Sequence, residues 1–298
     1  MHQKTCIIIC GPTASGKTST AIEVAQYFNT EIISADSRQC FKELGIAVAK
    51  PNSAELEKVP HHFINSHSFH DNFTAADYEK YALQKIEAIF KKHNVAVIVG
   101  GTGLYIKAFA DGLDEIQPIA ENIKNEIALG YKENGIAWLQ NKIQEEDKLF
   151  FENGEMQNPH RLIRALEVIR SSGKSILRHQ QKIKKQRDFN IIKIGLDINR
   201  EQLYANVNNR VDAMLQNGLV QDAQNLFQHK ALNALQTVGY RELFDAFENK
   251  TTVEKAIELI KQNTRHYAKR QITWFKKDEE VHWVEKEKIL EFVKNINL

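Results

Sequence analysis

The segment Gly11-Pro12-Thr13-Ala14-Ser15-Gly16-Lys17-Thr18 decides the fold of this chain. It fits the pattern G-x-x-x-x-G-K-[ST] at every fixed position. Residues 5–10 (TCIIIC) precede it, and this β-branched run is typical of a strand buried on both faces of a parallel sheet. A helical pattern follows over residues 18–28. The strand–loop–helix order predicts a phosphate-binding loop (P-loop) in an α/β protein.

All eight residues of the loop are expected to bind phosphate: Gly11, Pro12, Thr13, Ala14, Ser15, Gly16, Lys17 and Thr18. Glycines let backbone N–H groups turn toward phosphate oxygens, and the helix N-terminus adds partial positive charge. Lys17 supplies a full charge, and the Thr18 hydroxyl is a natural ligand for Mg²⁺, the expected cofactor. The alternative is a chance match in a turn, which the flanking strand and helix disfavour.

Further buried strands are indicated at residues 31–35 (EIISA), 95–99 (VAVIV) and 191–198 (IIKIGLDI), with a helix over residues 74–92. Residues 114–188 are polar and helical in period, and Asn158-Pro159 and Gly173 mark the start and end of one helix. We therefore predict an α/β fold. A P-loop parallel sheet core with helices on both faces (residues 1–113 and 189–298) is interrupted by an all-helical insertion (residues 114–188).

The composition of the 298 residues is that of a globular protein, with a formal net charge of +2. No apolar run approaches the roughly 20 residues that cross a bilayer, and no signal-peptide pattern opens the chain. The spacing of Cys6, Cys10 and Cys40 suits neither a disulfide framework nor a zinc site. These features predict a reduced, cytoplasmic protein without a membrane partner, and a monomer requires no further assumption.

Two basic segments, residues 182–187 and 261–277, permit a polyanionic partner. A group of histidines is not interpreted as a metal site, because neither cysteines nor clustered acids join it at ligand spacing. These are His61, His62, His67 and His70.

The sequence places an acidic residue beside the loop, but not where a kinase carries it. An NTPase or kinase is expected to hold Mg²⁺ with an acid that ends a buried strand. Residues 95–99 run instead into Gly100-Gly101-Thr102-Gly103. Asp36 ends the preceding strand, at the sheet edge where open α/β folds bind substrates. The alternative role for Asp36 is an Asx turn or a helix cap.

Seven segments in order resemble one family, the tRNA dimethylallyltransferases (bacterial isopentenyl-tRNA transferases). They are GPTASGKT (11–18), ISADSRQ (33–39), VGGTGLY (99–105), HRLIRALEV (160–168), RVDAM (210–214), VGYREL (238–243) and AKRQITWF (268–275). The resemblance implies transfer of a dimethylallyl group from dimethylallyl diphosphate to N6 of the adenine 3′ of the anticodon in tRNA, with release of pyrophosphate. The P-loop would then bind the diphosphate of the donor.

The resemblance also assigns roles to residues. Asp36 is implied as the general base, Thr13 and Thr102 as residues that line the donor and adenine pocket, and Arg210 as a cation for the leaving group. The implied tRNA-binding residues, for the anticodon stem-loop, are Asp36, Ser37, Arg38, Gln39, Thr102, Lys124, His160, Arg161, Leu162, Ile163, Arg164, Lys261, Arg265 and Lys269.

Local alternatives exist for the cations. Arg210 adjoins an apolar helical stripe (Leu203, Val207, Val211 and Met214), so it is expected to need an anionic partner, with Asp212 as the local option. Arg161 and Arg164 share one helix face. The alternative to RNA binding there is a local ion pair between Arg164 and Glu167. Lys261, Arg265 and Lys269 recur every four residues. The same spacing is typical of a charged helix face that contacts only water, which is the alternative to RNA binding. Trp274 and Phe275 are expected in the core.

Three positions depart from the family pattern: Asn206 where arginine is common, His160 where glutamine is common, and Phe41 where tyrosine is common. The alternative functions are an adenylate (AMP, ADP or ATP) dimethylallyltransferase, a small-molecule kinase that binds ATP in the same loop, and a non-catalytic P-loop RNA-binding protein. The helical insertion disfavours the adenylate prenyltransferase, because a small acceptor does not need it. The missing acid after Val99 disfavours the kinase. Asp36 beside the loop disfavours the non-catalytic RNA-binding protein, which would have no use for it.

Overall fold

The structure is a computed structural model that describes residues 4–114, 116–179 and 184–296. Its contacts divide the chain into a first unit, residues 1–111 with 186–298, and a second unit, residues 112–185. These breaks lie within three residues of the predicted boundaries. Lys182, from the predicted basic segment 182–187, lies outside the described residues.

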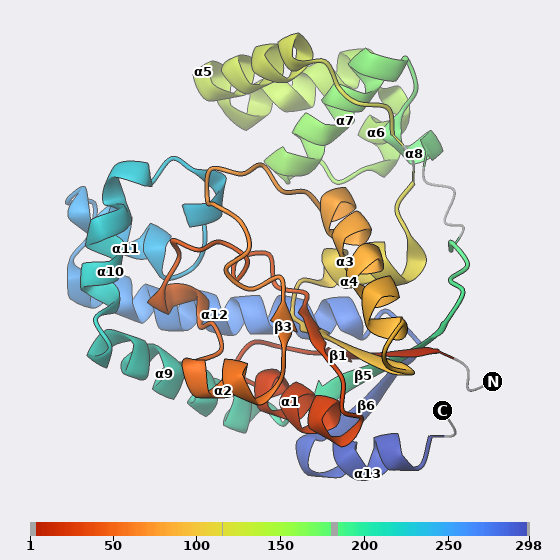
Figure 1. Ribbon diagram of the computed structural model, residues 1–298. Helices are drawn as coiled ribbons and strands as arrows, with labels where there is room; N and C mark the ends of the chain where they lie inside the picture. The colour runs from red at the N-terminus through yellow and green to blue at the C-terminus, as the bar shows by residue number, and fades with distance from the viewer. Residues whose placement is uncertain (1–3, 115, 180–183, 297–298) are drawn as a thin grey trace. The chain divides into compact units, whose positions relative to one another are not determined.

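The first unit is built on one parallel sheet with strand order β3-β2-β4-β1-β5-β6 (Figure 1). The strands are β1 (Thr5–Cys10), β2 (Ile32–Ser34), β3 (His61–His62), β4 (Val95–Gly100), β5 (Asn190–Asp197) and β6 (Val281–Glu285). In the register, Cys10 lies opposite Gly100 on one side and Gly195 on the other. The P-loop after β1 and the turn after β4 therefore leave the sheet at the same edge.

Both faces of this sheet are covered, which explains its continuous apolar strands. Because side chains alternate along a strand, β1 sends Ile7 and Ile9 into one core and Cys6, Ile8 and Cys10 into the other. Helices α1 (Lys17–Tyr27) and α13 (Ile289–Lys294) pack in the first of these cores. The predicted α/β fold with helices on both faces is confirmed.

The second core is formed with helices α3 (Ala75–Phe90), α4 (Gly103–Asp111), α10 (Leu219–Leu226), α11 (Tyr240–Phe247) and α12 (Val253–Phe275). Helices α2 (Ser53–Lys58) and α9 (Arg200–Gln216) and the 3-10 turns η1 (Ile46–Val48), η2 (Phe227–His229), η3 (Asn233–Leu235) and η4 (Lys286–Lys288) complete the unit.

The second unit consists of helices α5 (Glu121–Glu146), α6 (Lys148–Asn153), α7 (Pro159–Ser172) and α8 (Ile176–His179). It has its own apolar core, which includes Ile127, Leu139 and Leu166. Helix α7 begins as its sequence predicts: the Asn158 side chain accepts hydrogen bonds from the first amides, and Pro159 occupies the first turn. It ends at Gly173, which adopts the left-handed conformation.

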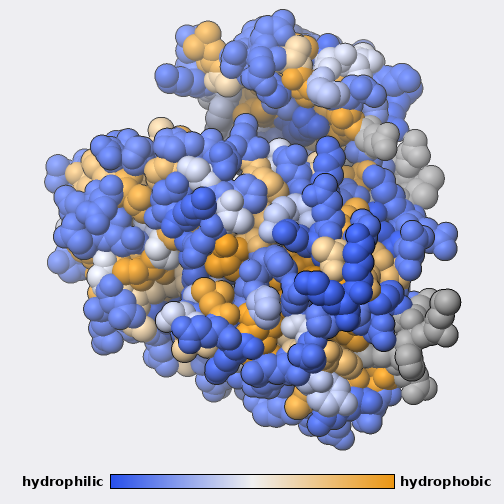
Figure 2. Space-filling model, in the orientation of Figure 1, coloured by the Kyte–Doolittle hydropathy of each residue, from blue (hydrophilic) through white to orange (hydrophobic). Residues whose placement is uncertain are grey.

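No helix among the described residues is both long and apolar enough to span a bilayer. The face seen in Figure 2 is mostly hydrophilic, with hydrophobic side chains among the hydrophilic ones.

Candidate active site

The P-loop connects β1 to α1 and is held by its own polar groups. Gly16 caps α1 with φ 90°, a left-handed conformation that favours glycine. The Ser15 hydroxyl donates to the Pro12 carbonyl at 2.8 Å, and the Lys17 ammonium donates to the same oxygen at 2.6 Å. The loop is therefore folded back on itself, with the Lys17 head at its centre.

Gln271 of α12 joins the P-loop to the turn after β4. Its side-chain oxygen accepts from the Thr13 amide at 2.8 Å, and its side-chain nitrogen donates to the Gly101 carbonyl at 2.9 Å. A Cβ on Gly101 would lie 2.2 Å from that nitrogen, so only glycine allows this approach. Gln271 is buried, and both of its polar groups are satisfied by the backbone. We call this arrangement the Gln271 brace.

Asp36 follows β2 and lies beside this brace. Its Oδ1 accepts from the amides of Arg38 at 2.9 Å and Gln39 at 3.2 Å. The Asx-turn alternative is therefore observed, and it fixes the carboxylate in place. In the described part of the chain, Oδ2 accepts no hydrogen bond.

Thr102 secures the segment after Asp36. Its hydroxyl accepts from the Ser37 amide at 3.0 Å, and its own amide donates to the Ala35 carbonyl at 3.1 Å. The Gln39 side chain has a different role: its Nε2 donates to the carbonyls of Val48 at 3.3 Å and Ala49 at 2.9 Å. Gln39 therefore holds the neighbouring loop.

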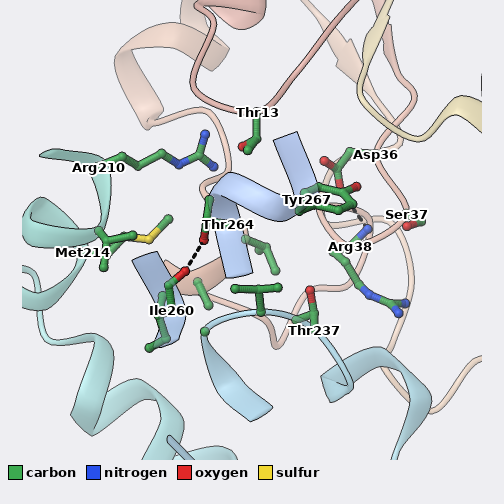
Figure 3. A pocket seen from close by; sticks show the side chains of 15 residues that line it. Thr13, Asp36, Ser37, Arg38, Arg210, Met214, Thr237, Ile260, Thr264 and Tyr267 are labelled. Atoms are coloured by element: carbon green, nitrogen blue, oxygen red, sulfur yellow. Dashed lines mark hydrogen bonds between the residues drawn. The ribbon is translucent and has the colours of Figure 1, made fainter. Parts of the chain in front are cut away.

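Many of the predicted site residues line two adjoining cavities of about 230 Å³ and 110 Å³. Thr102, which was expected to line the donor and adenine pocket, is not among the lining residues of either cavity. Lys17 and Thr18 line the larger one. Both cavities share four lining residues, Thr13, Asp36, Arg210 and Tyr267. Figure 3 shows Thr13, Asp36 and Arg210 around the smaller cavity, with the Tyr267 ring beside the Asp36 carboxylate. The phosphate loop and the carboxylate thus face a common space.

The charged residues that line the two cavities are the cations Lys17, Arg38 and Arg210 and the carboxylates Asp36 and Glu55. Burial and the positive charge of Arg210 together lower the pKa of Lys17 to about 8, and the negative charge of Asp36 opposes this shift. Burial also lowers the pKa of Arg210, and the negative charge of Asp36 again opposes the shift. Burial and the nearby Asp36 charge raise the pKa of Tyr267 to about 12, so its phenol stays protonated. The site has an excess of positive charge that an anion would compensate.

Asp212, the alternative partner for Arg210, forms a salt bridge with another residue. Lys261 pairs with Asp212 at 2.5 Å, and within the described ranges Arg210 forms no salt bridge. Leu203, Val207 and Val211 are buried beside it, as the helical stripe predicts. Arg210 therefore points an unpaired charge into the phosphate cavity.

The residues present suit a magnesium ion that arrives with phosphate. Among the described residues, no three His, Cys, Asp or Glu side chains gather into a metal site. Thr18 lines the larger cavity beside Lys17 and offers a hydroxyl. Mg²⁺ is commonly bound by one or two protein oxygens together with substrate phosphates and water.

The predicted tRNA-binding residues of the second unit differ in availability. His160 and Arg161 are exposed at the start of α7. Arg164 pairs with Glu167 at 3.1 Å, which is the local alternative, and Lys124 pairs with Glu121 at 2.6 Å. Ile163 packs against the core of this unit. The Leu162 side chain is fully buried in this core, so only its backbone is left for the predicted contact with tRNA.

The basic stripe of α12 turns toward α9. Lys261 pairs with Asp212, and Arg265 donates to the Asn208 side chain at 2.7 Å. Lys269 is exposed. Two of the three cations thus have local partners, as expected of a solvated helix face.

Two further predictions concern packing. Phe275 is buried, as expected, whereas Trp274 is 43% exposed, so its assignment to the core is wrong. Asn206, one of the departures from the family pattern, donates to the Ala14 carbonyl at 3.2 Å and so supports the P-loop.

Sequence reasoning missed Gln271 and Tyr267 as site residues. Both lie on the face of α12 that also carries Ile260 and Thr264, at helical spacing. That spacing was a usable signal, but which face of α12 meets the P-loop is decided by tertiary packing.

The parallel sheet, the P-loop and the shared cavity define a P-loop protein with a carboxylate beside its phosphate cradle. Residues 39–278 match the family model described as IPP transferase. The chain belongs to the IPP transferase family, and the resemblance seen in the seven segments is confirmed.

Curated relatives and a solved structure agree with this assignment. The chain is 49% identical to a tRNA dimethylallyltransferase of Christiangramia forsetii, over 94% of this chain and 92% of that protein. It is 46% identical to one of Flavobacterium johnsoniae, over 94% and 93%. A crystal structure of a tRNA isopentenylpyrophosphate transferase from Bacillus halodurans matches with a TM-score of 0.72 and 33% identity, covering 98% of this chain and 95% of that one.

Proposed function

We propose that this protein transfers a dimethylallyl group from dimethylallyl diphosphate to N6 of the adenine 3′ of the anticodon in tRNA. One observation carries the proposal: Asp36 lines the same cavity as Lys17 and Thr18 of the P-loop. A phosphate cradle alone serves many reactions. A carboxylate fixed beside it serves one in which a proton leaves while a diphosphate departs.

The reaction forms one bond and breaks another. The adenine N6 attacks C1 of the dimethylallyl group, and the bond from C1 to the diphosphate oxygen breaks with release of pyrophosphate. The N6 amine is a poor nucleophile because its lone pair is delocalised into the ring. It must lose a proton as the C–N bond forms, and a positioned base contributes roughly 10²–10⁴-fold to such a step.

Asp36 is the group placed to accept that proton. The amides of Arg38 and Gln39 hold its Oδ1, Oδ2 accepts no hydrogen bond from the described residues, and Asp36 lines both cavities. Thr102 fixes the backbone of Ser37 directly after it. The carboxylate thus needs no reorganisation when the adenine enters, which is the condition for efficient general-base catalysis.

The departing pyrophosphate gains negative charge, and the cavity supplies the opposite charge. Lys17, Arg210 and the amides of the P-loop line the space where it forms. Mg²⁺ bound through Thr18 and the diphosphate oxygens would add further neutralisation.

A polynucleotide acceptor agrees with the helical unit better than a free adenylate does. A small acceptor needs only the cavity, whereas the second unit presents His160 and Arg161 exposed on α7. Exposed cations bind phosphates of RNA, and a base whose amine must react is normally extruded from its stack.

Purified protein with labelled dimethylallyl diphosphate and Mg²⁺ tests the proposal when tRNA, AMP, ATP and a tRNA lacking that adenine are offered separately. The expected result is label in the first tRNA alone. Transfer to AMP or ATP instead would establish the adenylate prenyltransferase. Phosphoryl transfer from ATP without prenylation would establish the kinase.

A further inference from the structure

Helix α12 carries an exposed aromatic and basic face that the proposed chemistry does not use in full. Tyr267 is 37% exposed and Trp274 is 43% exposed, although both are large rings. Arg270 between them and Lys277 beyond them are also exposed, and the Arg270 guanidinium lies 5.8 Å from the centre of the Tyr267 ring. Residues seven apart lie two turns apart on one side of a helix. We call Tyr267, Arg270 and Trp274, together with Lys277 in the turn just after the helix, the α12 face.

One end of the α12 face is in the candidate active site. Tyr267 lines both cavities together with Asp36 and Thr13. The face therefore begins where the acceptor adenine must enter and leads away from it along the helix.

Trp274, farther along the face, is held by the segment that carries Thr102. A Cβ on Gly103 would lie 2.2 Å from the indole Nε1 and 2.3 Å from Cδ1, so the indole packs against the Gly103 backbone. The rest of the ring is left to solvent, while the adjacent Phe275 fills the core. The indole is thus fixed in orientation one residue from Thr102 and still presents surface to a partner.

An exposed ring with cations before and after it matches the needs of single-stranded nucleic acid. Bases stack on aromatic side chains irrespective of their identity, and neighbouring cations bind the backbone phosphates. The backbone positions that carry the two rings are about 10.5 Å apart along the helix axis, whereas stacked bases rise by about 3.4 Å. They must therefore serve different bases.

We propose that Trp274 is a stacking platform for an unpaired nucleotide next to the acceptor adenine, with Arg270 on the intervening phosphate. This inference rests on the proposed function, since the nucleotide belongs to the same RNA substrate. It adds a contact that leaves the reacting atoms untouched and positions the loop around them.

The test measures binding of an anticodon stem-loop RNA to the full chain and to Trp274→Ala, Trp274→Leu and Trp274→Phe. Loss of one stacked base predicts a rise in Kd of roughly 5- to 150-fold for the alanine variant. Leucine, which fills space without a ring, should resemble alanine, and phenylalanine should restore most of the affinity. Tyr27→Ala is the matched control, because Tyr27 is 50% exposed on α1; it should leave the Kd unchanged. The KM for dimethylallyl diphosphate should stay the same in all variants.

A second arm locates the stacked base. An abasic site is placed on one side or the other of the acceptor adenine. For one of these two RNAs, the Trp274→Ala variant should bind as tightly as the wild type, because the base that stacks on Trp274 is already missing. In the wild type, tryptophan fluorescence should be quenched on RNA binding, and Trp274→Phe should remove the part of the quenching that the abasic site also removes.

Either of two outcomes would overturn the platform: an unchanged Kd for Trp274→Ala, or equal losses of affinity with and without each abasic site. Each of these presupposes that the wild type modifies the stem-loop. Absence of modification by the wild type would instead defeat the proposed function itself.

Discussion

Lys17 shows how single residues set the chemistry of the cavity. Its ammonium is surrounded by protein, and Arg210 shares the cavity with it. Burial and this second charge lower the pKa of Lys17 to about 8. A lysine with a lowered pKa is charged below that value and neutral above it, so the strength of the phosphate cradle depends on pH near 8.

We predict that kcat/KM for dimethylallyl diphosphate falls as the pH rises above about 8, because the free enzyme then loses the Lys17 charge. Lys17→Arg provides the comparison, since a guanidinium stays charged throughout this range. Steady-state rates from pH 6.5 to 9.5 with both proteins measure the effect. The same falling limb in the arginine variant would show that another group titrates.

At the scale of elements, α12 organises the site through the Gln271 brace. Gln271→Leu removes both hydrogen bonds and leaves the Thr13 amide and the Gly101 carbonyl without their partner. Each buried unsatisfied group costs about 1–3 kcal/mol. We expect the free energy of unfolding to fall by about 2–6 kcal/mol and the KM for the donor to rise, because the P-loop loses its support. Urea unfolding and steady-state kinetics measure these changes.

Two companion variants sharpen this prediction. Gln262→Leu alters an exposed glutamine of the same helix and should change neither quantity. Gln271→Glu keeps the acceptor for the Thr13 amide but, once ionised, places a carboxylate against the Gly101 carbonyl. Its defect should therefore grow as the pH rises through the carboxyl pKa, and a pH-independent defect would refute the role of the brace.

Sequence patterns predicted the strong elements and not the weak ones. Strands β1, β4 and β5 lie within one residue of their predicted bounds, because strands buried on both faces leave continuous apolar runs. Strand β3 has only two residues, both histidines, and β6 (VHWVE) mixes apolar and polar residues. Both are edge strands, where the sheet tolerates short and polar segments.

The same distinction holds for the candidate site. Lys17, Thr18 and Asp36 follow buried strands, so the local pattern placed them at one sheet edge. Gln271 and Tyr267 reach that edge from α12, more than 200 residues later in the chain. Trp274 was assigned to the core because apolar character predicts burial on average, and its exposure depends on how α12 packs against Gly103.

For the whole molecule, the separate cores of the two units predict a division of labour. Arg187, just after the insertion, donates to the carbonyls of Ala108 at 3.1 Å and Phe109 at 2.9 Å. The segments at which the chain leaves and re-enters the first unit therefore lie next to each other. A short Gly/Ser linker can replace residues 112–185 between them.

We expect this shortened protein to fold and to bind dimethylallyl diphosphate as the full chain does, but to bind tRNA weakly. The slope of log K for tRNA against log salt should also fall in magnitude, by about one unit for each phosphate group that the shortened protein no longer binds. Calorimetry with the donor and filter binding with tRNA at several salt concentrations measure both. Undiminished tRNA affinity would place RNA recognition in the first unit alone.

The central claim is that one cavity holds the diphosphate cradle and the base that deprotonates the adenine. Asp36→Asn tests it most directly, because the amide keeps the shape of the carboxylate and its oxygen can still accept from Arg38 and Gln39. In single turnovers with saturating tRNA and donor, we predict unchanged tRNA affinity and a rate of N6-dimethylallyladenosine formation at least about 100-fold lower. A rate close to that of the wild type would contradict the claim.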